Sequence, residues 1–366
     1  MTTDVTDIGV ETIRTGLLGG GFMARVHTAA ARTAGADLVG VATSTAAGSA
    51  AAARELGYRH AGTDAHALIS DEIDVVHICT PNATHADFAR AALAAGRHVI
   101  CEKPLATDVG EARELAALAA ETGLVAAVPF VYRYHPMVRE ARARISQGEA
   151  GEVLTVDASY LQDWMLLPSD DDWRADAAGG PSRAFADIGS HLFDLVEFVS
   201  DSRVTRVAAR TRRVYERRGD HAVRNEDIAA VLFELSSGAV GTALISQMAA
   251  GRKNALTIEV HGSRRSLRFE QERPEELWVG DRTSSQLLLR DPATAHADSA
   301  RLQRVPAGHP MGYQDAFDAF VADVYAAIAG ASPEGLPTFD DGARAAVLTD
   351  AVLRSAAENA WIEVSA

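Results

Sequence analysis

One segment near the N-terminus limits the possible folds of this chain more than any other. A short apolar run, Arg14–Leu18, leads into residues 19–24, GGGFMA, and the following residues 25–34 have a helical pattern. A strand, a glycine turn and a helix in this order are typical of a nucleotide-binding βα unit. Gly19 permits the tight turn, and Gly21 lets a pyrophosphate approach the backbone. The segment therefore predicts a dinucleotide site at a sheet edge, where a helix N-terminus faces the phosphates.

Strand-like and helix-like segments then alternate over the first third of the chain. The apolar runs that predict strands lie at residues 14–18, 37–42, 74–79, 97–101 and 124–130. Alternation of this kind is typical of a doubly wound parallel sheet with helices on both faces. We therefore predict an α/β protein whose N-terminal nucleotide-binding domain spans residues 1–130.

The pattern changes after residue 130. A predicted helix at 136–147 is followed by period-two strands that succeed one another without helices between them, at Val153–Tyr160, Ile228–Leu235, Val240–Gln247 and Leu256–His261. Such succession predicts a large, mostly antiparallel sheet in a second, α+β domain over residues 131–366. Residues 281–312 show no sustained period and are predicted to form loops and edge strands. Helices are expected at about 313–330 and 340–358.

The end of the second predicted strand bears on the choice of cofactor. An acidic residue often binds the adenosine ribose at this point, but the chain reads Ala42-Thr43-Ser44-Thr45, with no Asp or Glu. The first cation after this loop is Arg54, which lies inside an alanine-rich helical stretch. Hydroxyl groups can bind either NAD or NADP, so the residues leave the choice open. We favour NAD, because a 2′-phosphate needs a cation more than a diol needs an anion.

A second polar segment follows the predicted strand at 97–101. The run ends in Glu102-Lys103-Pro104, and proline cannot donate to a strand ladder. The two charges therefore lie at the carboxyl edge of the sheet, where parallel sheets bind ligands. A solvated loop is the alternative interpretation.

A third chemical cluster lies in the second domain. Asp187 and His191 are four residues apart within a segment of helical period, so they share one helix face. A carboxylate one turn before an imidazole can orient the ring and raise its affinity for a proton. The alternative is a helix N-terminal acid followed by a structural histidine.

Composition excludes several classes of partner. The chain has 35 Lys and Arg against 50 Asp and Glu, a formal charge of −15, which argues against nucleic acid or an anionic membrane. Its two cysteines, Cys79 and Cys101, each end an apolar run and are expected to be buried, reduced thiols. No stretch approaches eighteen apolar residues, and no signal peptide is evident at the start. We expect a cytoplasmic protein without a metal site.

Together these motifs resemble those of the Gfo/Idh/MocA oxidoreductases, which include glucose-fructose oxidoreductase and inositol dehydrogenase. The resemblance covers nearly the whole chain and rests on the glycine turn, on Thr80-Pro81-Asn82 with His85, on Glu102-Lys103-Pro104 and on Asp187-x-x-x-His191. It implies a Rossmann domain followed by an open-faced sheet domain. It also implies a cis Lys103–Pro104 peptide bond and a homo-oligomer, a dimer or tetramer, formed through the C-terminal sheet.

The resemblance assigns roles that the chemistry of these residues supports. Lys103 would polarise the reacting hydroxyl, His191 would be the base, and Asp187 would orient His191 and bind a neighbouring substrate hydroxyl. The residues expected to contact the cofactor are Gly19, Gly21, Phe22, Met23, Thr43, Ser44, Thr80, Pro81, Asn82, His85, Glu102, Lys103 and Arg174.

Substrate contacts are expected from the domain junction and from the strand after it. Gln162-Asp163-Trp164 offers an amide, a carboxylate and an aromatic face, which suits a polyhydroxylated ring, although core packing is the alternative for Trp164. This tripeptide resembles the corresponding residues of the pyranoside and levoglucosan dehydrogenases of the family. Tyr132 and Arg133 lie at the junction and are further candidates, alongside Lys103, Asp187 and His191.

The favoured function is therefore NAD(P)-dependent oxidation of a secondary hydroxyl in a sugar, glycoside or polyol. Two other functions stay open. One is a glycosidase that oxidises and re-reduces its substrate within a turnover, and the other is a dinucleotide-binding regulator. Retention of Lys103 together with His191 counts against the regulator.

Overall fold

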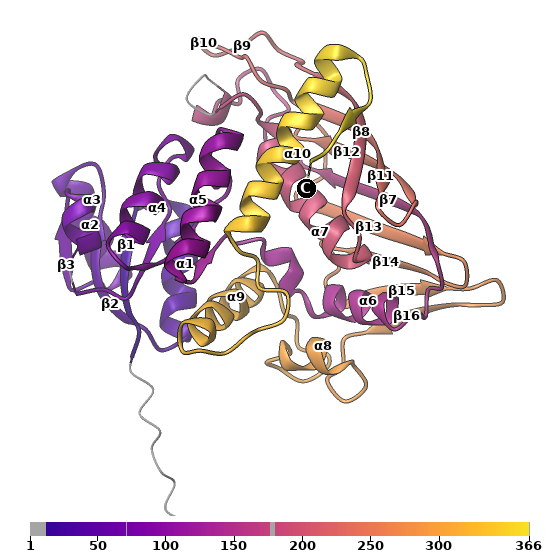
Figure 1. Cartoon of the computed structure of the whole chain (residues 1–366), viewed down its shortest axis with the longest axis horizontal. Helices are drawn as coiled ribbons and strands as arrows, with labels where there is room; N and C mark the ends of the chain where they lie inside the picture. The colour runs from indigo at the N-terminus through magenta and orange to yellow at the C-terminus, as the bar shows by residue number, and fades with distance from the viewer. Residues whose placement is uncertain (1–11, 71, 176–179, 366) are drawn as a thin grey trace, which may run out of the picture.

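The computed structural model describes residues 12–70, 72–175 and 180–365. Two sheets lie side by side, each with its own helices, and the yellow C-terminal helix α10 (Phe339–Glu358) runs between them (Figure 1). Every strand of the first sheet lies between residues 14 and 127, and every described strand of the second lies between 153 and 363. The α/β fold class expected from the sequence is confirmed.

The first sheet is parallel throughout, in the strand order β3-β2-β1-β4-β5-β6. Its elements are β1 (Arg14–Leu18), α1 (Phe22–Thr33), β2 (Asp37–Ala42), α2 (Ala46–Leu56), β3 (His60–Gly62), α3 (Ala65–Ser70), β4 (Val75–Ile78), α4 (His85–Ala94), β5 (His98–Cys101), α5 (Val109–Thr122) and β6 (Ala126–Ala127). The sequence missed β3, because its three exposed residues carry no apolar alternation. It also predicted β6 too long.

The register of the central strands brings the polar segments together. Leu18 pairs with Ile78, and Ile78 pairs with Cys101, so β1, β4 and β5 end at the same level. The residues that follow these strands, Gly19, Cys79 and Glu102, therefore lie side by side at the carboxyl edge of the sheet. Both cysteines are free thiols: Cys101 is buried and Cys79 is partly buried.

The second sheet has the strand order β16-β15-β14-β13-β7-β12-β11-β8-β17 and is antiparallel except between β7 and β12. Its elements, with the helices around it, are α6 (Pro136–Ser146), β7 (Val153–Leu161), α7 (Ser190–Ser200), β8 (Val204–Arg212), β11 (Ile228–Leu235), β12 (Val240–Ser246), β13 (Ala255–Gly262), β14 (Ser266–Glu270), β15 (Glu276–Gly280), β16 (Ser285–Leu289), α8 (Ala297–Arg301), α9 (Tyr313–Ile328), α10 and β17 (Ile362–Glu363). A small hairpin, β9 (Arg217–Arg218) with β10 (His221–Ala222), lies outside it.

The two faces of this sheet differ. Alternate residues of β11 and β12 are buried in one hydrophobic cluster with residues of α7 and α10, and the residues between them lie on the other face of the sheet. Leu232, Leu244 and Trp361 are exposed on that second face. One face of the large sheet is therefore open, as the resemblance to the family implied.

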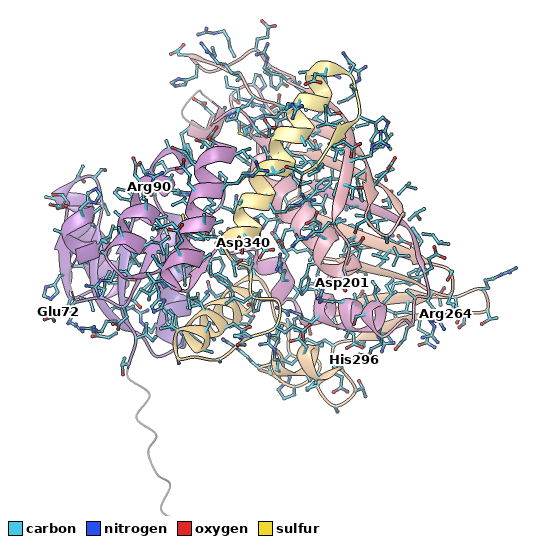
Figure 2. All side chains as sticks on the ribbon, in the orientation of Figure 1. Glu72, Arg90, Asp201, Arg264, His296 and Asp340 are labelled. Carbon is cyan, nitrogen blue, oxygen red and sulfur yellow. The ribbon has the colours of Figure 1, made fainter. Side chains whose placement is uncertain are left out.

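The last long helices join the two domains. Helix α9 packs on α1 of the first domain, and α10 contacts α5 on one side and α7 and β8 on the other. Glu72 on the first domain and Arg264 on the second lie on opposite sides of the molecule (Figure 2). No helix within the described residues is both long and apolar enough to cross a membrane.

Candidate active site

A cavity of about 1000 Å³ lies at the carboxyl edge of the first sheet and extends to the second domain. The first domain contributes the glycine turn and the segments after β2, β4 and β5. The second contributes residues from β7, from the segment before α7 and from the loop before β13. A volume of this size at the switch point of a doubly wound sheet is typical of a ligand site.

The glycine turn leaves space where a dinucleotide would bind. Gly19 has a φ of +112°, and a Cβ there would lie 2.4 Å from the Cys79 carbonyl oxygen, so the tight turn requires glycine. At Gly21, by contrast, an added Cβ would meet nothing within 4 Å. Gly21 is also the N-cap of α1. The helix N-terminus and an open backbone surface thus meet at one wall of the cavity, which fits a pyrophosphate.

The end of β2 provides hydroxyl groups and no charge. Thr43 and Ser44 line the cavity as predicted, and the Thr43 hydroxyl contacts Ser49 Oγ at 2.9 Å. Among the described residues that line the cavity, Lys103 is the one lysine or arginine, and it follows a different strand, β5. Arg54 lies in the last turn of α2 and does not reach the cavity.

The three predicted catalytic residues meet where the two domains face each other. Lys103 Nζ lies 2.7 Å from Asp187 Oδ1 and 3.0 Å from the Asp187 carbonyl oxygen. Lys103 comes from the loop after β5, and Asp187 from a π-helical turn, Phe185–Gly189, that leads into α7. His191 lines the same part of the cavity. The Lys103–Pro104 peptide bond is cis, as the resemblance implied.

The environment of His191 reverses one expectation from the sequence. Burial and the nearby charge of Lys103 lower the pKa of His191 to about 3, although Glu102 and Asp187 oppose the shift. Asp187 was expected to raise the proton affinity of the ring, but its two carboxylate oxygens bind Lys103 Nζ and Gln247 Nε2. The ring is therefore neutral at ordinary pH.

Ring packing sets the orientation of His191. The imidazole lies edge-on to Phe130 and Tyr132, with centroid distances of 5.6 and 5.1 Å. Its Nδ1 atom is buried and has no hydrogen-bond partner among the described residues. Nε2 is therefore the ring nitrogen that a molecule in the cavity can reach.

A polar wall adjoins these residues, and Tyr132 in this wall packs against the His191 ring. The hydroxyls of Tyr132 and Tyr160 contact each other, and Tyr160 donates to Asn254 Oδ1 at 2.7 Å. Asn254 Nδ2 donates to the Tyr132 oxygen at 3.2 Å, and Gln162 Nε2 donates to Asn254 Oδ1 at 2.8 Å. Burial raises the pKa of both tyrosines, so their hydroxyls stay protonated. Hydroxyls and amides of this kind suit a polyhydroxylated ligand.

Three predicted substrate residues do not line this cavity. Arg133 is buried against Asp194 and Asp341, because a desolvated guanidinium needs carboxylate partners. Asp163 pairs with Lys253 at 2.7 Å. Trp164 packs neither in the cavity nor in the core: it is 37% exposed and donates to Gln162 Oε1.

The remaining predicted cofactor residues fall into two groups. Phe22, Met23, Thr80, Pro81, Asn82 and Glu102 line the cavity with the glycines. His85 also borders it, but both ring nitrogens contact backbone carbonyls, those of Thr80 and Pro104, at 2.7 and 2.8 Å. His85 thus links the loops after β4 and β5. The side chain of Arg174 lies outside the described part of the structure.

Sequence reasoning missed several residues that the fold brings to the cavity. Asn254 and Tyr313 line it, and Gln247 holds Asp187. Tyr160 and Trp173 line it too, in the two segments where the sequence indicated substrate contacts. A polar residue just before β13 has no local motif, so only pairing of β13 with β7 places Asn254 beside Tyr160. The sequence did not supply the position of Asn254 relative to the sheet.

Known proteins resemble the chain over almost its whole length. Residues 13–130 match the model of an oxidoreductase family with an NAD-binding Rossmann fold, and residues 138–268 match the GFO/IDH/MocA C-terminal domain. Levoglucosan dehydrogenase of Pseudarthrobacter phenanthrenivorans is 31% identical over 97% of this chain and 99% of its own length. Inositol 2-dehydrogenase of Rhizobium meliloti is 30% identical over 97% and 100%.

Solved structures agree with the sequence matches. A levoglucosan dehydrogenase in complex with NADH and levoglucosan superposes with a TM-score of 0.91 at 30% identity, covering 97% of this chain and 100% of that one. An inositol dehydrogenase homologue from Azotobacter vinelandii with NAD+ gives 0.90 at 28% identity, covering 97% and 98%. This chain therefore belongs to the Gfo/Idh/MocA family of oxidoreductases, and its first domain is the NAD-binding Rossmann fold of that family.

Proposed function

We propose that this protein oxidises a secondary hydroxyl of a sugar, glycoside or polyol by transferring a hydride to NAD. The observation that carries the proposal is the cluster of Lys103, Asp187 and His191 in the cavity, beside a wall of hydroxyls and amides. A cation, a carboxylate and a neutral imidazole in one part of a cavity are the groups that alcohol oxidation requires.

Each residue has a distinct part in the proposed reaction. The oxidised nicotinamide supplies the hydride acceptor when it is bound. Lys103, held by Asp187, would donate a hydrogen bond to the reacting oxygen and stabilise its developing negative charge. His191 Nε2 would take the hydroxyl proton as the C–H bond breaks and the C=O bond forms. Asp187 would accept a hydrogen bond from a neighbouring substrate hydroxyl.

The substrate class follows from the polar wall and from the relatives. Tyr132, Asn254 and Gln162 can bind several hydroxyls at once, and Trp173 adds an aromatic surface. The levoglucosan dehydrogenase is similar to this chain over 97% of its residues. We therefore propose a pyranose ring or a closed derivative of one, such as an anhydrosugar, as the substrate.

The cofactor choice follows from the charge around the end of β2. Thr43 and Ser44 can bind the ribose diol, and the described residues there offer no cation to a 2′-phosphate. We therefore propose that the enzyme prefers NAD to NADP.

A screen at 340 nm tests both assignments. Levoglucosan, myo-inositol and a panel of pyranosides are each offered with NAD and with NADP, and stoichiometric NADH is expected from at least one pyranose-type compound. Glycoside cleavage without net NADH would instead establish the glycosidase alternative. A protein that binds NADH tightly but turns over no compound would support a regulator, and a tenfold preference for NADP would contradict the interpretation of Thr43 and Ser44.

We also propose that the open sheet face joins copies of this chain in a dimer or tetramer. Leu232, Leu244 and Trp361 expose apolar surface on a broad, flat sheet, and such patches usually mark interfaces. Light scattering should give a multiple of the monomer mass, and the double substitution Leu232→Asp and Leu244→Asp should reduce it. Leu167→Asp, an exposed leucine outside the sheet, is the control. A monomeric parent protein would refute this proposal.

A further inference from the structure

A continuous chain of buried polar side chains runs from the cavity into the first domain. Glu102 Oε1 lies 3.1 Å from His27 Nε2, and His27 Nδ1 lies 3.0 Å from His77 Nδ1. His77 Nε2 then lies 3.0 Å from the Tyr325 hydroxyl, which contacts Thr15 Oγ1 at 3.0 Å. The five residues come from β1, α1, β4, the loop after β5, and α9.

This series of hydrogen-bonded side chains is closed off from solvent. Thr15, His27 and His77 are 0% exposed, and Tyr325 is 6% exposed. Among these residues only Glu102 lines the cavity. Thr15, at the end away from the cavity, is completely buried. The hydrogen-bonded side chains therefore do not lead protons to solvent. They form a fixed arrangement of hydrogen bonds rather than a proton channel.

The partner of each ring nitrogen limits the hydrogen bonds of this series. A carboxylate can only accept, so His27 Nε2 donates to Glu102. Burial, reinforced by His27, lowers the pKa of His77 well below its usual value, so His77 is a neutral ring with one N–H and one acceptor nitrogen. One of its nitrogens therefore donates and the other accepts, which connects His27 to the Tyr325 hydroxyl. Bonds connected in this way strengthen one another.

The second oxygen of Glu102 is also engaged. The backbone N–H of Lys103 donates to Glu102 Oε2 at 3.2 Å. Burial alone would raise the pKa of Glu102, but the bond from His27 and the nearby charges hold it below its usual value. Glu102 is therefore a carboxylate anion at the cavity wall, and its contacts with buried residues fix its position.

We propose that the Thr15–Tyr325–His77–His27 chain positions Glu102 as a fixed anion beside the nicotinamide site, so that the protein binds NAD+ more favourably relative to NADH. The oxidised nicotinamide ring is positively charged and the reduced ring is neutral, so an anion at this end of the cavity discriminates between them. Glu102 borders Lys103 and His191 in the cavity, the end at which hydride transfer is proposed. His27, His77, Tyr325 and Thr15 are positioning residues, since they act through Glu102.

This inference rests on the placement of the nicotinamide in the proposed function, but not on the identity of the sugar. Its test therefore uses the cofactors alone. The dissociation constants of NAD+ and NADH are measured by isothermal titration calorimetry on the full-length protein without substrate, and their ratio is the readout. A wrong substrate assignment would leave this ratio untouched.

Two substitutions at His27 separate its two contacts. The amide nitrogen of glutamine reaches about as far as Nε2, whereas that of asparagine reaches only about as far as Nδ1. His27→Gln therefore keeps the donor to Glu102, and His27→Asn loses it. Glu102→Gln should raise the ratio of the NAD+ to the NADH dissociation constant on the order of tenfold, the usual effect of one nearby charge. His27→Asn should approach that value. His27→Gln keeps the donor to Glu102 but loses the contact with His77, so the ratio should rise by only about threefold.

Tyr325→Phe tests transmission along the chain. Tyr325 does not line the cavity, so a rise of the ratio by about threefold would have to pass through His77 and His27. Tyr58→Phe is the matched control: it removes a buried hydroxyl that contacts Thr28 on the same helix as His27, and it should leave the ratio unchanged. A ratio within twofold of the parent in Glu102→Gln overturns the proposal. Equal weakening of both cofactors in His27→Asn and Tyr325→Phe would also overturn it, because it indicates a purely structural role.

Discussion

Replacing Lys103 by methionine should lower kcat by about a hundredfold or more, the usual cost of removing a group that stabilises a developing oxyanion. Methionine keeps much of the length of the side chain but cannot donate to the reacting oxygen. Asp187 would keep its contact with Gln247, so the fold should survive the loss of the ion pair. The measurement is the initial rate of NADH formation with the substrate identified by the screen, together with a thermal melt.

The chain offers a matched control for this substitution. It contains two lysines, and the second, Lys253, is largely exposed and pairs with Asp163 outside the cavity. Lys253→Met should therefore leave kcat within about twofold of the parent. If Lys103→Met retained kcat within threefold while Lys253→Met behaved as expected, Lys103 would not be the group that polarises the hydroxyl.

Replacing His191 by asparagine should also lower kcat by about a hundredfold, because the hydroxyl proton loses its acceptor. The pH profile adds a sharper expectation. Since the pKa of His191 is lowered to about 3, the imidazole stays a neutral base well below pH 6.5, and it is lost as a base only when the pH falls toward 3. The acid limb of kcat/KM in the parent should therefore lie below pH 6.5, the ordinary value for histidine.

The acid limb of the kcat/KM profile tests Lys103 and His191 together. The charge of Lys103 contributes to the lowered pKa of His191, after burial, so in Lys103→Met the acid limb should move to higher pH. His261→Asn, a partly exposed histidine on β13, is the control and should change neither kcat nor the limb. An acid limb near pH 6.5 in the parent, or one that is unmoved in Lys103→Met, would contradict the coupling.

Local patterns were enough to predict much of the fold. The glycine turn at Gly19, the apolar strands at 14–18 and 37–42 and the late helices appear where the sequence placed them. These elements follow from short-range chemistry, because strand alternation, helix periodicity and glycine turns are encoded by neighbouring residues. β3 escaped prediction because its three residues are all exposed and show no burial pattern.

The sequence placed residues at the cavity most directly where a polar motif follows a strand. Thr43, Pro81 and Asn82 line the cavity, since each lies directly after a strand whose end faces it. The prediction of which side chains line the cavity was less accurate where a side chain could turn in two directions. Arg133 lies at the domain junction as expected, but it turns toward the buried carboxylates Asp194 and Asp341.

The sequence by itself predicted two sheets of different kinds, the sheet edge that borders the cavity and three polar residues that the structure brings together there. Only the tertiary structure decided how those three are paired. Asp187, four residues from His191, was expected to serve the histidine, yet it binds Lys103, which is 84 residues away. Helix spacing states which side chains share a face, but an ion pair forms with whichever charge the packed domains bring within reach. The contact between His27 and His77 arises in the same way, because it exists only once α1 packs on the parallel sheet.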